Sequence, residues 1–289
     1  MDITALQVFL AVAETGSFSR GAERVFLTQP AVSKRIAALE SQFGTRLFDR
    51  IGRRIHLTPA GQALLTQARV ILNDIEDAKR RIANLSGEIG GRLGLGTSHH
   101  IGLHRLPPAL KRFHRDYPGV HLDLRFMDSE AACGAVERGE LELAIVTLPT
   151  APRAPLNLVP VWDDPLEIVV GNRHPLATQR SIDAAALVRY PAVLPGSGTF
   201  TRELILSALG SHREQLNIAM STNYLEVLKM LVAIGLGWSA LPHTLIDDEL
   251  KVVHIEEIKI RRALGIITHS ARSLSNAAQA MIGIVKTTK

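Results

Sequence analysis

Apolar residues recur at helical spacing along the first part of the chain, which predicts three short helices in close succession. The first helix spans residues 3–14 and the second lies within residues 17–27. The third begins at Gln29, and one of its faces is apolar while the other is small, polar and basic. Its apolar positions are Val32, Ile36, Leu39 and Phe43. Two short helices joined tightly, the second with a polar outer face, indicate a helix-turn-helix.

Local signals define where the third helix begins and which element comes after it. Thr28 is a plausible N-cap, and Pro30 lies in the first turn, where a missing N–H costs nothing. The helix should therefore begin sharply at Gln29. Downstream, apolar residues flank a Gly52-Arg53-Arg54 tip, which predicts a β-hairpin wing that carries positive charge.

A heptad pattern distinguishes the next predicted helix, which begins after Thr58. Its apolar residues recur alternately four and three positions apart, at Leu64, Ala68, Ile71, Ile75, Ala78, Ile82 and Leu85. From Pro59 to Glu88 such a helix extends over roughly 45 Å, too far for the small preceding domain to cover. We expect it to pair with its own copy in a two-fold dimer. The alternative is that it packs on its own carboxy-terminal domain.

After a glycine-rich hinge at residues 86–91, short apolar strands alternate with helices. The strands are expected at 92–97, 122–126, 143–147, 166–170, 192–194 and 265–268, and the helices at 107–117, 130–138, 201–209 and 225–235. This alternation predicts an α/β domain with parallel strands, whose ligand crevice lies at the carboxyl ends of the strands.

Charge is concentrated in the helix-turn-helix region. Residues 20–54 contain eight arginine and lysine residues against three acidic ones, an excess of five that equals the net charge of +5 of the whole 289-residue chain. Such clustering indicates a phosphate-binding surface; the alternative is a basic protein without affinity for nucleic acid. With 46% apolar and 21% charged residues, the composition is ordinary for a globular protein of two or three domains.

The single cysteine, Cys133, excludes an intramolecular disulfide and suits a reducing compartment. We expect it to be a packing residue rather than a redox sensor. No apolar run approaches membrane-spanning length, and the amino terminus has no basic segment ahead of its apolar residues. We therefore expect a cytoplasmic protein without a membrane partner.

The amino-terminal motifs resemble those of LysR-type transcriptional regulators. The matching segments are Ser17-Phe18-Ser19, Gln29 to Ser33, Leu39-Glu40, Gly44, Leu47 to Arg50 and Leu57 to Gly61, with a weaker match at Glu226, 231–233, Gly235, Gly237 and Leu241-Pro242. Gly21 departs from the family, which usually has alanine there, and we expect it only to weaken a short helix slightly.

The resemblance implies a fold and its boundaries. A winged helix-turn-helix is expected at 1–58, a linker and dimerisation helix at 59–88, and an effector-binding domain at 89–289. That last domain resembles type 2 periplasmic binding proteins, with lobe I at about 92–161 and 268–289 and lobe II at about 162–267.

The expected helix-turn-helix implies a set of DNA contacts. Gln29, Ser33 and Lys34 should approach base edges in the major groove, while Arg53 and Arg54 should lie on the backbone or in the minor groove. The full set of expected DNA-binding residues is Arg20, Thr28, Gln29, Pro30, Ser33, Lys34, Arg35, Arg53 and Arg54.

Several expected strands end in hydroxyl-rich turns that lead into helices, where exposed N–H groups suit an anion. By the family analogy a small effector binds there, between the lobes. The expected residues are Ser98, His99, Ser129, Thr147, Ser197, Thr199 and Phe200. The alternative for each hydroxyl is an ordinary helix cap.

The sequence gives weaker support to a metal site, a dinucleotide site or a catalytic site. His100 and His104 would share a helical face close to His99, but the sequence shows no third ligand at a recognisable spacing, so we expect no metal. The glycines of residues 91–96 do not open a helix, which disfavours a dinucleotide site. No nucleophile elbow or acid–base pair indicates an enzyme.

The sequence thus predicts a DNA-binding transcriptional regulator whose DNA binding or bending responds to a small anionic effector. The resemblance further implies an inverted-repeat operator, a homodimer that forms a tetramer as a dimer of dimers, and contact with RNA polymerase. The alternative is an architectural DNA-binding protein with no working effector site.

Overall fold

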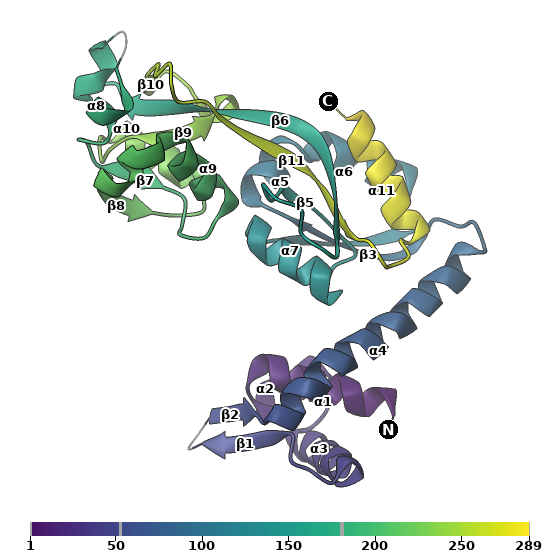
Figure 1. The fold of residues 1–289 in the computed structure, drawn as a ribbon. Coiled ribbons are helices and arrows are strands. Elements are labelled where there is room, and N and C mark those ends of the chain that lie inside the picture. Colours follow the sequence, from purple (N-terminus) through teal and green to yellow (C-terminus); the bar gives the residue numbers. More distant parts are fainter. Residues whose placement is uncertain (1, 52–53, 180–181, 289) are drawn as a thin grey trace. The chain divides into compact units, whose positions relative to one another are not determined.

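The computed structural model describes residues 2–51, 54–179 and 182–288 and divides into two compact units, Met1–Ser86 and Gly87–Lys289 (Figure 1). The first unit contains four helices and a two-stranded wing among its described residues. These elements are α1 (Ile3–Thr15), α2 (Phe18–Arg24), α3 (Gln29–Phe43), β1 (Phe48–Ile51), β2 (Arg54–Leu57) and α4 (Pro59–Asn84). The wing strands pair antiparallel, and the predicted winged helix-turn-helix is confirmed.

The termini of α3 are set by local chemistry. Thr28 occupies the N-cap position and Pro30 lies in the first turn, as predicted, but the Thr28 side chain makes no capping hydrogen bond within the described part of the chain. Gly44 ends the helix in the left-handed conformation, at φ 62°. Because α3 has a fixed start and end, its outward face is defined.

The core of the first unit buries Val32, Ile36 and Leu39 of α3, as expected. The expectation that Phe43 belongs to this apolar face is wrong, because its side chain is 47% exposed. In the turn between α2 and α3, Val25 packs inward, while Phe26 adopts a φ of 55° and is 95% exposed.

Gly21 has a stronger role than a mild weakening of α2. A Cβ at this position would lie 2.8 Å from Val12 Cγ2 and 3.0 Å from Val12 Cα. Those distances are shorter than ordinary contacts, so the glycine is what allows α2 to approach α1 closely.

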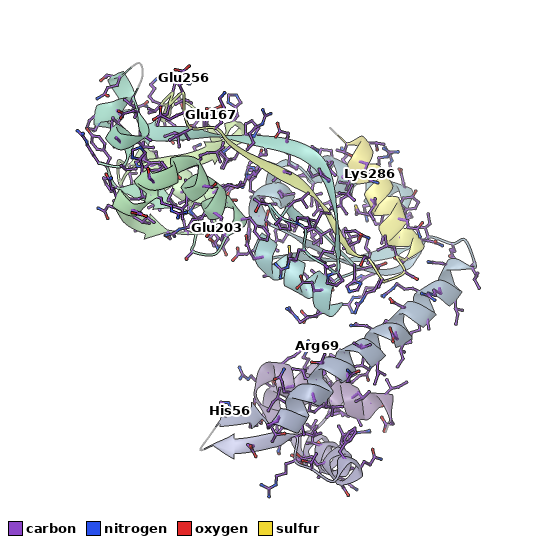
Figure 2. The ribbon with its side chains drawn as sticks, in the orientation of Figure 1. His56, Arg69, Glu167, Glu203, Glu256 and Lys286 are labelled. Atoms are coloured by element: carbon purple, nitrogen blue, oxygen red, sulfur yellow. The ribbon has the colours of Figure 1, made fainter. Side chains whose placement is uncertain are left out.

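The heptad seam of α4 divides into two parts. Leu64 and Ala68 are buried in the core of their own unit, so the expectation that they pair with a second copy is wrong for them. Ile71 packs partly against the same core, and Arg69, labelled on α4 in Figure 2, forms an ion pair with Glu14 of α1 at 3.0 Å. Farther along, Ile82 and Leu85 are 71% and 86% exposed. The helix ends at Asn84 rather than Glu88.

The second unit alternates strands and helices. Its elements are β3 (Gly91–Thr97), α5 (His99–His104), α6 (Pro107–Asp116), β4 (Val120–Phe126), α7 (Ser129–Arg138), β5 (Leu143–Thr147), β6 (Leu156–Gly171), η1 (Pro175–Thr178), α8 (Ala184–Leu187), β7 (Ala192–Leu194), α9 (Phe200–Leu209), η2 (Gly210–Gln215), β8 (Ile218–Ser221), α10 (Leu225–Ala233), β9 (Ser239–Pro242), η3 (His243–Leu245), β10 (Leu250–Val252), β11 (Ile260–His269) and α11 (Asn276–Thr287).

The main sheet is mixed, which corrects the expectation of parallel strands. Its order is β10-β6-β11-β5-β3-β4, with β9 also on β6. Strand β3 pairs parallel with β4 and β5, but β11 pairs antiparallel with both β5 and β6. Because β6 and β11 are long, antiparallel and paired with each other, they extend through the whole unit (Figure 1).

Two sets of cores define the lobes. Lobe I consists of β3, β4, β5, α5, α6, α7 and α11, whose buried residues form two clusters, one with Trp162 and Leu264 and the other with Leu156 and Ile267 of the long strands. Lobe II consists of β7 to β10 and α8 to α10, whose clusters include Leu166 and Ile260, or Val169. The segments of β6 and β11 between these residues join the lobes.

Two further expectations concern the environment of Cys133 and the presence of membrane-spanning helices. Cys133 is buried in α7, where burial raises the pKa of its thiol to about 11, consistent with a packing residue. Among the described helices, none is both long and apolar enough to cross a membrane.

Candidate functional site: an exposed helix face and an inter-lobe cleft

The outward face of α3 presents short polar and basic side chains. Thr28, Gln29, Pro30 and Lys34 are exposed, and Ser33 is partly exposed. The Gln29 side-chain amide donates to Ser33 Oγ at 3.0 Å, so these two side chains one turn apart form a single polar surface. Such a surface can offer both a donor and an acceptor to base edges.

Two arginines near this face already interact with other groups of the protein, one by a short hydrogen bond and one by a longer ion pair. Arg20 Nη2 donates to the Thr15 carbonyl at 2.6 Å, and Arg35 lies 3.8 Å from Asp2, an exposed pair that contributes little to stability. Arg54 lies in β2 of the wing. The side chain of Arg54 and the whole of Arg53 lie outside the described residues.

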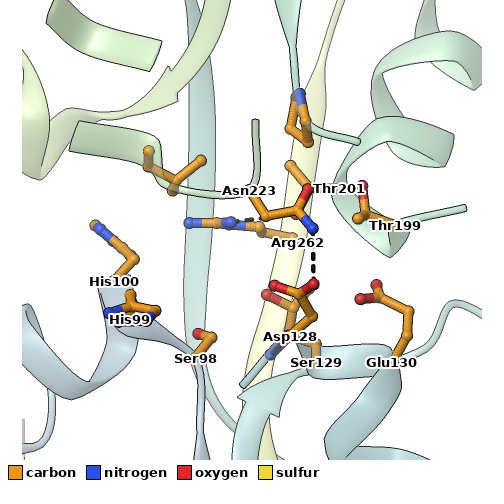
Figure 3. Close-up of a pocket in the computed structure, with 13 residues that line it drawn as sticks. Ser98, His99, His100, Asp128, Ser129, Glu130, Thr199, Thr201, Asn223 and Arg262 are labelled. Carbon is orange, nitrogen blue, oxygen red and sulfur yellow. Dashed lines mark hydrogen bonds between the residues drawn. The ribbon is translucent and has the colours of Figure 1, made fainter. Parts of the chain in front are cut away.

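The structure brings five of the seven expected effector residues to one cleft between the lobes. Ser98, His99, Ser129, Thr147 and Thr199 line it (Figure 3), and the further lining residues are His100, Asp128, Glu130, Pro195, Thr201, Asn223, Leu225 and Arg262. The cavity is about 50 Å³, room for a few water molecules.

The hydroxyl groups that line the cleft differ in the hydrogen bonds that they already make within the protein. Thr199 Oγ1 accepts from the Arg202 N–H at 3.3 Å and caps α9, and Ser129 Oγ accepts from the Thr147 N–H at 3.2 Å. Ser98 makes no capping bond to its helix in the described part of the protein. The ordinary structural role thus holds for Thr199 and Ser129, whereas Ser98 does not cap its helix.

Two expected residues do not line the cleft. Ser197 lies exposed in the turn before α9. Phe200 packs against the core of lobe I, and its backbone N–H donates to Glu130 Oε1 at 2.5 Å. Phe200 therefore joins the two lobes and is not a wall of the cavity.

Arg262 is the most important lining residue that the sequence reasoning missed. The register of β11 on β6 places it opposite Asp164, and its Nε donates to Asp164 Oδ2 at 2.7 Å. Its Nη1 donates to Thr201 Oγ1 at 3.2 Å. Arg262 is 4% exposed, and its Nη2 has no hydrogen-bond partner among the residues that the structure describes. A buried guanidinium nitrogen without a partner is costly, so it is a natural point for an acceptor group.

The two lobes are held together by polar contacts at the rim of the cleft. The Asn223 amide donates to Asp128 Oδ2 at 2.7 Å (Figure 3), and its Oδ1 accepts from the Gly196 N–H at 2.8 Å. Farther along the same rim, His104 Nε2 and Glu226 Oε1 lie 3.1 Å apart. Asp128 and Glu130 make the rim acidic, whereas Arg262 makes the floor basic. The cleft therefore has acidic groups at its rim and a buried cationic group at its floor.

Two protein-family models match the chain, one for each of its two units. Residues 3–62 match the model of the bacterial regulatory helix-turn-helix protein, lysR family, and residues 86–289 match the LysR substrate binding domain. A probable RuBisCO transcriptional regulator of Synechocystis sp. is 33% identical over 287 residues, which cover 96% of this chain and 83% of the relative.

Solved structures share the fold over the whole chain. A full-length OxyR variant from Pseudomonas aeruginosa is 24% identical with a TM-score of 0.71, and the match covers 100% of this chain and 96% of that one. CbnR in complex with its target DNA is 21% identical with a TM-score of 0.64, covering 99% of each chain. Because both domain models match in order along nearly all of its length, the chain belongs to the LysR family of DNA-binding transcriptional regulators.

Proposed function

We propose that α3 reads a specific operator through Gln29, Ser33 and Lys34 while the wing contacts the DNA backbone. The observation that carries this is the exposed polar face of α3 on a buried apolar core, with its termini fixed by Pro30 and Gly44. That CbnR is described in complex with its target DNA supports the same mode of binding here. As a DNA-binding regulator the protein should act in the cytoplasm, and the regulator family supports a role other than catalysis.

The DNA proposal is tested with an operator selected from random duplexes. Binding should weaken steeply with salt because phosphate contacts release counterions. Gln29→Ala should lose about 1–3 kcal/mol on the operator and little on random DNA. Arg54→Ala should weaken both alike, and Gln42→Ala, on an exposed position near the end of α3, is the matched control. Equal losses on both kinds of DNA for Gln29→Ala would remove its reading role.

We also propose that the effector is a small molecule with one carboxylate or similar anionic group, bound by Arg262 and Ser98. The unpaired Arg262 Nη2 supports the anionic group, and the acidic rim of Asp128 and Glu130 disfavours a second one by like-charge repulsion. Because the cavity is small, the lobes must open to admit such a ligand, and that motion is a means to alter the DNA-binding heads.

A panel of mono- and dicarboxylates and inorganic phosphate tests this second proposal by thermal shift of the full-length protein. We expect a monocarboxylate to raise the melting temperature and Ser98→Ala to reduce the shift, whereas Ser197→Ala, outside the cleft, should leave it unchanged. Arg262→Met should abolish it. A cleft that binds none of the panel would favour an architectural DNA-binding protein.

Assembly follows from the exposed part of α4. We propose that Ile75, Ala78, Ile82 and Leu85 pair with their copies in a homodimer, which presents two α3 helices to an inverted repeat. Their full or partial exposure in the single chain supports this. A dimer of dimers and contact with RNA polymerase would complete the regulatory complex, as the family resemblance implies.

A further inference from the structure

Three side chains with metal-ligating groups meet at one edge of the cleft. His100 and His104 lie one turn apart on α5 in lobe I, and Glu226 lies in the first turn of α10 in lobe II. One candidate ligand atom from each lies within 4.8 Å of the other two. Glu226 Oε1 is 3.1 Å from His104 Nε2 and 3.8 Å from His100 Nδ1. The third ligand, which the sequence did not reveal, thus comes from a residue 122 positions beyond His104.

The state of His100 is a second and independent observation. Its side chain is 4% exposed, and neither of its ring nitrogens has a hydrogen-bond partner among the described residues. Burying an imidazole without partners is costly, and an ion bound at Nδ1 would offset that cost.

The surrounding charges leave room for a cation. Arg262 is close enough to His100 to oppose one, but it donates to Asp164 at 2.7 Å, and Asp164 offsets part of its charge. Glu226 supplies the negative charge that faces the two imidazoles.

We propose that His100, His104 and Glu226 bind a divalent transition metal ion, with zinc as the best fit, and that the ion ties α5 to α10 across the cleft. Two imidazoles and a carboxylate are a common donor set for zinc with a fourth position open to water, whereas Ca²⁺ and Mg²⁺ prefer oxygen ligands alone. Ligand atoms around tetrahedral zinc lie about 3.3 Å apart, close to the 3.1 Å and 3.8 Å that separate Glu226 Oε1 from the two imidazoles, so small side-chain rotations would complete the site.

Metal titration of the full-length protein, first treated with a chelator, tests the proposal. Calorimetry with Zn²⁺ should give one ion per chain, and Co²⁺ should give the visible absorption of a tetrahedral site. His104→Ala and Glu226→Gln should each weaken Zn²⁺ binding at least about tenfold, because even losing a group that only orients a ligand costs that much. His114→Ala and Glu203→Gln, both exposed and outside the cluster, should leave binding unchanged.

The proposal is overturned if Zn²⁺ does not bind, or if it binds equally to His104→Ala, Glu226→Gln and the controls. Both ligand positions are partly exposed, so these variants should fold, which circular dichroism verifies. The metal affinity is measured without DNA or effector. A failure here would therefore leave the proposed regulator function standing, and failure of operator binding would leave the metal site standing.

Discussion

At the scale of single residues, the least ordinary positions are a strained aromatic and a buried thiol. Phe26 combines a left-handed backbone with almost complete exposure, an arrangement that costs free energy and gains no packing. Cys133 is the reverse, since it is fully buried in an apolar cluster and gains packing at the expense of reactivity. Each leads to a measurable outcome.

Replacing Phe26 should stabilise the first unit. Asparagine tolerates positive φ better than phenylalanine, so Phe26→Asn should gain about 1 kcal/mol. The measurement is native-state hydrogen exchange of the α2 and α3 amides, because both tryptophans, Trp162 and Trp238, lie in the other unit. Phe43→Asn, at an exposed helical position, is the control and should give no gain. Slower exchange in both variants would mean that the gain in stability does not come from relieving the positive φ at position 26.

The thiol of Cys133 should react slowly. Its pKa of about 11 leaves far less thiolate at pH 8 than an ordinary cysteine has, so we expect reaction with a disulfide reagent to be about a hundredfold slower than in guanidinium chloride. Because the folded pKa is raised, the rate should climb about tenfold for each pH unit up to that value. A native rate equal to the unfolded rate would show that the thiol is accessible and ionised.

Among the elements, α4 is notable because its heptad pattern serves two different contacts. Its first turns complete the core of the winged helix-turn-helix through Leu64, Leu65 and Ala68, while its last turns leave Ile82 and Leu85 uncovered. Exposed residues of this size on a long helix indicate a partner surface. The buried part of the helix gives way to the exposed part near Ile71, where the core of the first unit ends.

Charge on the exposed end of α4 should prevent dimer formation. Ile82→Glu or Leu85→Glu places a carboxylate in an apolar seam, which costs several kcal/mol when it is buried, so light scattering should show monomers. Val70→Glu, on an exposed position outside the seam, should remain dimeric. If all three variants dimerise alike, the contact lies elsewhere.

At the scale of the whole second unit, the ligand cleft is shaped by the two long strands and closed by a few contacts between the lobes. Arg262 and Asp164 lie where β11 and β6 join the two cores, and Asn223 bonds Asp128 from the opposite lobe. The Phe200 N–H also donates to Glu130 across the cleft, so several polar contacts join the lobes.

Removing Asn223 should open the rim. Asn223→Ala breaks its bond to Asp128 of lobe I, which contributes about 1 kcal/mol, so hydrogen exchange at the Phe200 amide, which donates to Glu130 across the cleft, should be at least about fivefold faster. Asn157→Ala, at an exposed site on β6, is the matched control. Unchanged exchange at Phe200 would show that other contacts keep the lobes together.

The sequence by itself determined the elements of the DNA-binding half and several residues of the cleft. Periodicity places Val32, Ile36 and Leu39 on one face, and capping chemistry fixes where α3 begins, because both depend on neighbours within a few residues. Ser98, Ser129 and Thr147 could be found since each lies at or just beyond the end of a strand recognisable by its apolar run. A period-two reading of β11 would also have put Arg262 on the inner face with Ile260 and Leu264.

The partners of those residues follow from three-dimensional packing, not from local sequence. The pairing of Arg262 with Asp164 and of Asn223 with Asp128, and the approach of Glu226 to His100 and His104, join segments 95 to 126 positions apart. The burial of Leu64 and Ala68 and the antiparallel path of β6 and β11 likewise depend on what lies beside them in space. Local preferences fix the shape of a segment, whereas burial and charge at a site are set by whatever the fold packs against it.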